Sequence, residues 1–353
     1  MKIVVLAGGR STERNVSLSS GVKITNALRS KGYQVALVDL FLGKELAEGT
    51  NIADLFTTEP EPEHALLIDD DILTDEKINA LRTDGTKGLF GKNVLAICQA
   101  ADMVYLGLHG EDGENGKVQA VLDLNEIRYT GSGTLASGLA MSKKYSKEVF
   151  EQNKIPTAPF TTTKDIDIAK ADIPFDFPVV IKPSNGGSSV GTHIVQSYAD
   201  LKAALQDAFQ FDDEVVIEKY IKGREFSVAI IDDQVLPPVE IVVTSGWYDF
   251  QHKFQANDET KFITPPDIDH ATNEVLANLT RQTFKALGMQ NYGRIDFLVN
   301  DEGAFVIEAN SLPGMTPLSL IPREAEAVNI SYPDLCDMII QSKLRIYEAK
   351  DNH

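Results

Sequence analysis

The stretch YGRIDFLVNDEGAFVIEAN, residues 292–310, constrains the fold more than any other part of the chain. Apolar and polar side chains alternate on both sides of NDEG, a pattern typical of two antiparallel strands joined by a tight turn. We expect residues 301–303 to form a three-residue loop in which Gly303 adopts a positive φ. Asn300 then pairs with Ala304, and this pairing sets the register of both strands.

The predicted register places two carboxylates opposite each other. Asp296 faces Glu308 across the hairpin. Arg294 faces Asn310 on the same side of the sheet, because side chains two positions apart share a face. Opposed carboxylates about 5 Å apart repel each other, so a cation is needed between them. Carboxylate and amide oxygens suit Mg²⁺, which usually binds substrate phosphates as well.

The alternative is a solvated sheet face that carries the two carboxylates by chance. The other face of the hairpin is apolar and is expected to belong to a core formed by Ile295, Phe297, Phe305 and Ile307. A hairpin with one buried face and opposed carboxylates on the other face favours the metal site.

The N-terminal part of the chain predicts a parallel sheet. KIVVLA, residues 2–7, is a continuous apolar run that ends at two glycines, as in a buried parallel strand. A segment with helical spacing and a second apolar run, QVALVDL, follow, and the order strand–helix–strand favours a parallel pair. Residues 44–92 are acid-rich and weakly periodic, and we interpret them as an elaboration or a mobile insert without chemistry. These segments predict an N-terminal α/β domain of residues 1–131.

Two further domains are predicted. Residues 132–221 combine a helical segment at 137–155 with a strand, a glycine-rich loop and another strand. Residues 222–353 carry the hairpin, further strands and a helix near 270–288. The predicted fold class is therefore α/β throughout.

The charge balance disfavours several classes of partner. The chain has 353 residues, with 33 Lys and Arg against 52 Asp and Glu, and a formal net charge of −19. Such a surface repels nucleic acid and anionic membranes, so neither is an expected partner. No apolar run reaches the length of a membrane span. The two cysteines, Cys98 and Cys336, form no metal or redox spacing, which is typical of reduced thiols in a cytoplasmic protein.

Two segments have features of a nucleotide site. In VVIKPSNGGSSVG, residues 179–191, a strand delivers Lys182 to a loop whose backbone N–H groups suit phosphate. A glycine-rich hairpin with a surface lysine would have the same pattern. VIEKYIKGREF, residues 216–226, joins two strands, and its backbone suits an adenine edge while Glu225 suits ribose hydroxyls. The alternative for this second segment is an ordinary surface connector.

Two loops of the N-terminal domain suit a small ligand. LHGEDGENGKVQA, residues 108–120, follows a buried strand, where open α/β sheets bind ligands. Its His109 is either a ligand contact or a satisfied loop histidine. AGGRSTERNVSLSSG, residues 7–21, has the same arrangement, and its Glu13 either holds an ammonium group or is an ordinary first-turn acid. The pattern G-x-G-x-x-G is absent, which disfavours a dinucleotide.

Together these segments resemble the ATP-grasp superfamily and, within it, the D-alanine–D-alanine ligases. HGEDGENGKVQA is similar to the first signature of that family, and RIDF, IEAN and SLPGMTPLSL are similar to the second. The resemblance covers nearly the whole chain apart from residues 44–92. It implies a three-domain ATP-grasp fold, in which an N-terminal parallel-sheet domain precedes two α+β subdomains that clamp ATP, usually in a homodimer.

The resemblance implies which residues would bind ATP and metal. The lid over the site would be an ω-loop at 244–265, which includes the aromatic stretch GWYDFQHKF. The ATP contacts would be Lys143, Lys182, Glu218, Lys219, Ile221, Glu225 and, from the lid, Lys253. Two Mg²⁺ ions, or Mn²⁺ in their place, would be held by Asp296, Glu308 and Asn310.

The resemblance also implies contacts to two amino-acid substrates. Glu13 would bind the ammonium of a first D-alanine, and His109 would lie beside its carboxyl end. Arg294 and the backbone N–H of Gly314 would form an oxyanion hole. The second substrate would be bounded by Ser188, Ser319 and Leu320.

The implied reaction is the ATP-dependent ligation of D-alanine to a second D-alanine through a D-alanyl phosphate, for peptidoglycan precursors. Many family members have Tyr where this chain has Phe254. Phenylalanine is usual there in ligases that make D-alanyl-D-lactate, and a less polar pocket favours a neutral hydroxy acid over an ammonium. D-Lactate is therefore an alternative second substrate. Another ATP-grasp carboxylate–amine ligase is a further alternative, which the signature around His109 disfavours.

Overall fold

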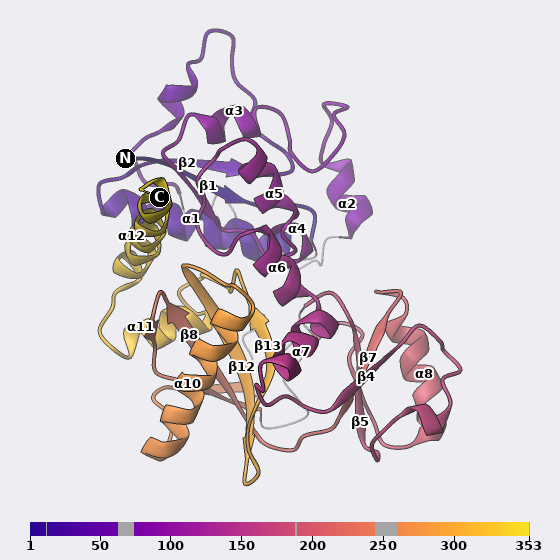
Figure 1. The fold of residues 1–353 in the computed structure, drawn as a ribbon. Coiled ribbons are helices and arrows are strands. Elements are labelled where there is room, and N and C mark those ends of the chain that lie inside the picture. The colour runs from indigo at the N-terminus through magenta and orange to yellow at the C-terminus, as the bar shows by residue number, and fades with distance from the viewer. Residues whose placement is uncertain (12, 63–73, 188, 244–259, 353) are drawn as a thin grey trace.

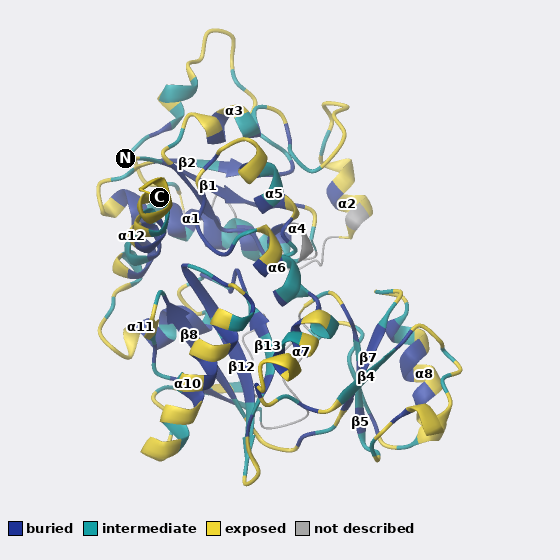
Figure 2. Cartoon of the chain, in the orientation of Figure 1, coloured by how far each residue is buried: buried dark blue, intermediate teal, exposed yellow. Residues whose placement is uncertain are grey.

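The computed structural model describes residues 1–11, 13–62, 74–187, 189–243 and 260–352 (Figure 1). Within those residues the strands form three sheets, of three, four and six strands. Their strands are largely buried, and the exposed positions gather on the outer faces of the helices and in the loops (Figure 2). None of the described helices is both long and apolar enough to cross a membrane.

The first sheet is parallel, as predicted. Its strand order is β2–β1–β3, and the helix α1, Arg14–Ser30, connects its first two strands. The strands are β1 (Lys2–Ala7), β2 (Gln34–Asp39) and β3 (Met103–Leu106). The short helices that follow β3 are α4 (Glu111–Glu114) and α5 (Lys117–Leu124). The C-terminal helix α12, Tyr332–Asp351, packs against α1, so the two ends of the described chain share one core.

The described parts of the acidic segment at 44–92 pack on this first sheet. Thr57 forms an isolated bridge with Val35, and the neighbouring Phe56 is 5% exposed. Gly43 passes so close to Lys92 that a Cβ on the glycine would lie 2.4 Å from the Lys92 carbonyl oxygen. The segment contains the 3₁₀ helix η1 (Ile52–Leu55) and the helix α2 (Asp75–Ala80), and α3 (Val94–Gln99) follows it. The described residues of this segment therefore contribute to the first α/β layer.

The second sheet has the order β4–β7–β5–β6 and is antiparallel. Its strands are β4 (Phe160–Thr163), β5 (Val179–Pro183), β6 (His193–Val195) and β7 (Val215–Lys219). The helix α8, Tyr198–Ala208, packs against it, and the short η3, Lys170–Asp172, lies nearby in the chain.

The helical spacing at 137–155 is confirmed, but the segment is divided between two helices. The helix α6, Thr134–Met141, ends one residue before Ser142, and α7, Lys143–Gln152, begins one residue after it. The Ser142 hydroxyl accepts the N–H of Tyr145, which is a typical N-cap bond for a serine. The chain therefore turns at Ser142 and gives Lys143 a place at a helix N-terminus.

The third sheet has the order β11–β10–β8–β12–β13, with β9 paired to β8. Its strands are β8 (Arg224–Ile231), β9 (Gln234–Val235), β10 (Val239–Val243), β11 (Thr260–Ile263), β12 (Tyr292–Asn300) and β13 (Gly303–Asn310). The helix α10, His270–Ala286, packs on β8 and β12 and confirms the helix predicted near 270–288. The helix α11, Leu320–Glu326, packs on β8.

The hairpin register is confirmed at the carboxylates and wrong at the turn. Asp296 pairs with Glu308, but Asn300 pairs with Gly303, so the loop has two residues. A bulge between the turn and Asp296 shifts the pairing by one residue. This shift compensates for the shorter loop, so Asp296 and Glu308 still pair as predicted. Gly303 has the expected positive φ, +135°.

The bulge also changes which residues belong to the core. Phe305 and Ile307 were expected in the core, but both line a cavity on the carboxylate face. The buried residues of β13 are Ala304, Val306 and Ala309. Because the bulge inserts one residue, the alternation along β13 reverses between its two ends.

A buried polar cluster joins the first sheet to the third. Lys343 on α12 donates to the carbonyl of Gly131 at 2.6 Å and lies 5.4 Å from the ring centres of Tyr129 and Tyr347. Asn291, just before β12, accepts the N–H of Gly131 at 2.7 Å. The predicted division at residue 131 stays a prediction, as does the division at 221. The cluster fixes the first layer relative to the hairpin.

We expect Lys343 to make stability depend on pH in the alkaline range. Burial lowers the pKa of Lys343 from 10.5 to about 8. Between these values the unfolded chain binds more protons than the folded chain, so stability rises with pH. The free energy of unfolding should rise more steeply in the wild type than in Lys343→Met, by up to about 1.4 kcal/mol per pH unit. Urea unfolding of both proteins from pH 7.5 to 10.5 measures this difference, and parallel curves would contradict it.

Candidate functional site

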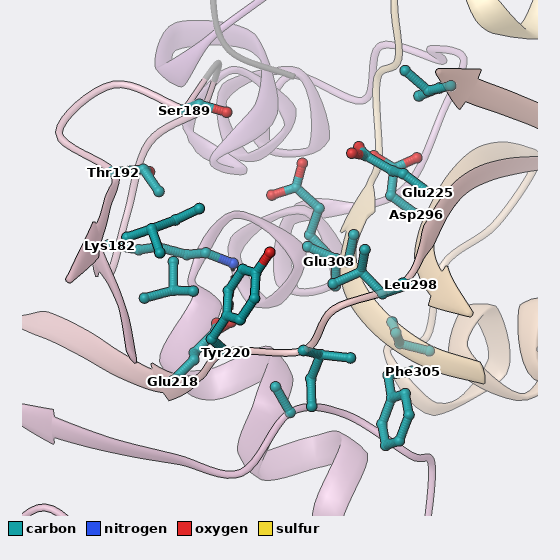
Figure 3. Close-up of a pocket in the computed structure, with 18 of the residues that line it drawn as sticks. Lys182, Ser189, Thr192, Glu218, Tyr220, Glu225, Asp296, Leu298, Phe305 and Glu308 are labelled. Carbon is teal, nitrogen blue, oxygen red and sulfur yellow. Dashed lines mark hydrogen bonds and ion pairs between the residues drawn. The ribbon is translucent and has the colours of Figure 1, made fainter. Parts of the chain in front are cut away.

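A cavity of about 410 Å³ lies between the four-stranded and six-stranded sheets. Figure 3 shows Lys182, Ser189 and Thr192 on one side and Glu225, Asp296 and Glu308 on the other. This volume is within the range of small-molecule sites. The cavity thus has a wall that carries cationic side chains and a wall that carries carboxylates.

The cationic wall is built around the carboxylate of Glu218. Lys182 on β5 and Glu218 on β7 are brought together by strand pairing, and Lys182 Nζ lies 3.0 Å from Glu218 Oε2. Lys147 on α7 approaches Glu218 Oε1 at 3.3 Å. Burial acts to raise the pKa of Glu218, but the two lysines outweigh it and hold that pKa below its ordinary value. Two lysines around one carboxylate leave this wall suited to an anion.

Lys147 was missed in the sequence analysis. It is 1% exposed, it also donates to the Thr157 hydroxyl at 2.6 Å, and burial lowers its pKa. The only sequence signal was its position four residues after Lys143 on the same helical segment, where side chains share a face. The carboxylate partner comes from a strand more than 70 residues away in the chain, about which this spacing carries no information.

Lys143 holds the glycine-rich loop at the start of α7. Its Nζ donates to the carbonyl of Gly186 at 2.6 Å, and its backbone N–H donates to Ser184 at 2.7 Å. Asn185 is held in turn by Asp212, which accepts from both its backbone and its amide nitrogen. Gly186 has a φ of +102° and open space around its Cβ position. The loop is therefore anchored at its first residues and open towards the cavity.

The residues predicted to bind adenosine line the same cavity. Lys219 and Ile221 lie at the end of β7 and in the connector beyond it, and Glu225 lies on β8. Leu298 and Phe305 add an apolar surface to the opposite wall (Figure 3). The structure brings the predicted nucleotide contacts into one cavity, with Lys253 outside the described residues.

Apart from Glu225 on β8, the carboxylate wall comes from the hairpin. Arg294 binds Asp296 with two hydrogen bonds, of 2.9 Å from Nε and 2.8 Å from Nη2. The Asn310 amide donates to Asp296 at 3.1 Å. Glu308 stands opposite Asp296 and lines the cavity. All four predicted residues of the hairpin are therefore gathered on one face.

The two N-terminal loops meet near this hairpin. His109 is 5% exposed and its Nε2 lies 3.0 Å from the Ser20 hydroxyl. Burial lowers the pKa of His109, although the Glu13 carboxylate acts in the opposite direction. The carboxylate of Glu13 also lies against Gly110, 3.4 Å from the position of a Cβ there. Glu13 and His109 are therefore neighbours, and their roles towards a substrate stay predictions.

Glu114 is a further carboxyl in this region that the sequence analysis missed. It accepts the backbone N–H of Gly110 at 2.9 Å. Burial raises the pKa of Glu114 to about 8, and the charge of Glu13 acts in the same direction while Arg294 opposes it. The sequence signal was its place in the HGEDGENG motif. The cluster of Glu13, His109 and Glu114 thus extends to the Arg294 end of the hairpin.

The segment after β13 contains three further predicted site residues, Gly314, Ser319 and Leu320. A Cβ on Gly314 would lie 2.9 Å from the Ser319 hydroxyl, so only glycine fits there without a shift. Ser319 accepts the N–H of Thr316 at 3.1 Å and stands at the N-terminus of α11. Leu320 is 7% exposed and packs with Val239 and Ile241. The structure therefore brings Gly314 and Ser319 together and places Leu320 in an apolar cluster.

Several predicted residues lie outside the described part of the chain. These are Ser188 in the glycine-rich loop and, in the predicted lid, Lys253 and Phe254. The last part of the predicted ω-loop at 244–265 is not a loop, because Thr260–Ile263 forms β11 and pairs with β10. The β10–β11 pair therefore brackets residues 244–259, whose predicted role as a lid stays a prediction.

Comparisons with known proteins agree with this arrangement. The family model described as D-ala D-ala ligase N-terminus matches residues 2–132, and the model described as D-ala D-ala ligase C-terminus matches residues 149–341. The D-alanine–D-alanine ligase of Pediococcus pentosaceus is 58% identical over 351 residues, 99% of each chain. That of Lacticaseibacillus casei is 55% identical over 348 residues, 98% of this chain and 97% of the other.

A solved structure supports the fold. The crystal structure of D-alanine–D-alanine ligase from Bacillus anthracis complexed with ATP has a TM-score of 0.75 and 29% identity, and the match covers 99% of both chains. The similarity confirms the predicted α/β ATP-grasp fold. From its matching family models, its curated relatives and its fold, the chain belongs to the D-alanine–D-alanine ligase family.

Proposed function

We propose that this chain joins D-alanine to a second D-alanine with the consumption of ATP. The observation that carries the proposal is the cavity of about 410 Å³, in which Lys182 lies on one wall and Asp296 and Glu308 lie on the other. A cationic wall and a carboxylate wall suit a nucleotide triphosphate and the divalent ion that accompanies it. The dipeptide would serve peptidoglycan synthesis, as the family relationship implies.

The hairpin residues fit a divalent cation. No group of three or more His, Cys, Asp or Glu side chains in the described ranges forms a metal cluster by itself. Mg²⁺ commonly uses one or two carboxylates and completes its shell with water and substrate phosphates. Asp296 and Glu308, with the amide oxygen of Asn310, match that smaller set. The ion, when bound, would neutralise charge on the transferred phosphoryl group.

The residues near the N-terminal loops fit the first D-alanine. Glu13 would hold its ammonium group, since its carboxylate lies beside Gly110 and its charge acts on the neighbouring His109. His109 would lie beside the carboxylate. This placement leaves the carboxylate directed towards the Arg294 end of the hairpin, where it would meet the γ-phosphate.

The reaction then proceeds in two steps. A carboxylate oxygen of the first D-alanine attacks the γ-phosphorus, the bond to ADP breaks, and D-alanyl phosphate forms. Lys182 and Lys143 stabilise the charge of the phosphates during this transfer. The neutral amine of the second D-alanine attacks the carbonyl carbon, inorganic phosphate leaves, and the nitrogen gives up one proton to the departing phosphate. Arg294 and the Gly314 N–H stabilise the tetrahedral oxyanion, a contribution of about 3–4 kcal/mol per donor.

The second substrate is proposed as D-alanine, with D-lactate as the less supported alternative. Relatives 55–58% identical are D-alanine–D-alanine ligases, whereas the case for D-lactate rests on Phe254 alone. The family relationship also supports a homodimer that acts in the cytoplasm.

We expect D-alanyl-D-alanine to be the main product at neutral pH. The enzyme would be supplied with ATP, Mg²⁺ and D-alanine, with and without equimolar D-lactate, and the products analysed by mass spectrometry. L-Alanine in place of D-alanine should leave phosphate release at background. A majority of D-alanyl-D-lactate at pH 7 would overturn the choice of acceptor but not the ligase chemistry.

We expect Lys182→Met to weaken ATP binding strongly. The substitution removes a cation from the cavity wall and leaves Glu218 with one lysine fewer. Loss of a charge-assisted contact of about 1.5–3 kcal/mol corresponds to a rise of roughly 10- to 100-fold in KM for ATP.

The matched control for this substitution is Lys144→Met. Lys144 is the neighbour of Lys143 and pairs with Glu214 at 2.8 Å, outside the cavity lining. Its KM for ATP should stay within threefold of the wild type. Equal effects of the two substitutions would show that Lys182 has no specific contact with the nucleotide.

A further inference from the structure

Glu324 is a buried carboxyl beside the carboxylate wall. It lies on α11, the helix that follows Gly314 and Ser319, and it is 0% exposed. Burying a carboxyl is unfavourable unless it makes hydrogen bonds. Its position therefore needs a physical reason beyond the filling of space.

Glu324 completes the hydrogen bonding of β8. Its Oε2 accepts the backbone N–H of Ala229 at 2.5 Å. One edge of β8 pairs with β10 as far as Ser227, and the same edge pairs with β9 from Ile230 onwards. Ala229 therefore lies in the gap between these two strand pairings. The carboxyl supplies the acceptor that a neighbouring strand would otherwise provide.

The other edge of β8 carries the residues of the proposed reaction. Ala229 stands opposite Arg294, and Ser227 stands opposite Asp296, on β12. Glu324 thus holds β8 at the residue that faces the arginine. The Oε1 atom of Glu324 and the Ser227 hydroxyl are also buried, and Ser227 acts to lower the pKa of Glu324.

The electrostatic surroundings of Glu324 include the same two residues of β12, Arg294 and Asp296. Burial raises the pKa of Glu324 well above its ordinary value, although the Ala229 N–H and the Arg294 charge act to lower it. The Asp296 charge acts in the same direction as burial. Arg294 makes both of its hydrogen bonds to Asp296 in these surroundings.

We propose that Glu324 is a positioning residue for the ligation: by holding β8 at Ala229, it sets the place of Arg294 and Asp296 on the facing strand. The inference rests on the proposed function, in which these two residues contact the oxyanion and the metal. Glu324 itself touches no reacting atom. Displacements of about 1 Å at a reacting centre can lower a rate by about 100-fold, so a small shift of β12 is sufficient to matter.

The test compares substitutions that distinguish the hydrogen-bond acceptor of Glu324 from the volume that its side chain fills. Glu324→Met keeps a side chain of similar length without the acceptor, and Glu324→Gln keeps a neutral acceptor. The control is Leu335→Ala on α12, a fully buried apolar residue of the same hydrophobic cluster as Ala229, which removes packing volume and no hydrogen-bond acceptor. For each protein the melting temperature, kcat, KM for ATP and the Mg²⁺ concentration for half-maximal rate are measured.

We expect Glu324→Met to lower kcat by about 10- to 100-fold and to raise the half-saturating Mg²⁺ concentration, with KM for ATP within threefold. Glu324→Gln should stay within threefold of the wild type in every parameter. Leu335→Ala should lower the melting temperature while kcat and the Mg²⁺ dependence are retained. If Glu324→Met does not fold, Glu324→Asp replaces it, because its shorter carboxyl cannot reach Ala229.

Two results would overturn the inference. If the acceptor-deficient variant behaves like Leu335→Ala, Glu324 has a purely structural role. If Glu324→Gln is impaired as strongly as Glu324→Met, the acceptor is not the feature that matters. Failure of the proposed function is distinguishable from both, because the wild type itself would then show no release of phosphate dependent on D-alanine.

Discussion

The opposition of Asp296 and Glu308 on one hairpin is the constraint on which the rest of the site depends. Their backbones are paired, so the two carboxylates cannot move apart without breaking the sheet. Ile295 and Phe297, on the other face of β12, are 0% exposed and hold the strand against α10. Arg294 and Asn310 compensate Asp296 by hydrogen bonds. The stability of the core thus maintains a local concentration of negative charge that a divalent cation would relieve.

The cationic wall of the cavity brings positive charges together, and it too needs a compensating charge. Lys147 and Lys182 are drawn into a region of low exposure by one carboxylate, Glu218, which is itself 4% exposed. Without that carboxylate, two lysines so close together would repel each other and lose hydration. Because the two walls come from different sheets, their separation defines the cavity. A nucleotide phosphate chain with its cation would join the walls by satisfying the charges of both.

The sequence predicted the carboxylate face because alternation and turn residues are local signals. It did not predict the bulge, since no residue type in β13 marks the place where one residue is inserted, and so Phe305 and Ile307 were assigned to the wrong face. The serine that separates α6 from α7 was an available signal, but the helical spacing on both sides of it obscured the break. The partners of Lys147 and the burial of Glu114 and Glu324 depend on contacts between elements distant in the chain, which periodicity does not report. The predicted roles of Ser188, Lys253 and Phe254 stay predictions.

The central claim is that Asp296 and Glu308 bind a divalent cation together with the nucleotide, and titration with Mn²⁺ tests it most directly. Binding in the presence of ADP would be followed by water proton relaxation for the wild type, Asp296→Asn, Glu308→Gln and, as a control at the exposed turn of the same hairpin, Glu302→Gln. We predict that Mn²⁺ binds the wild type and the control alike and binds both cavity variants at least tenfold more weakly. Equal binding by all four proteins would contradict the assignment of the metal site to the hairpin.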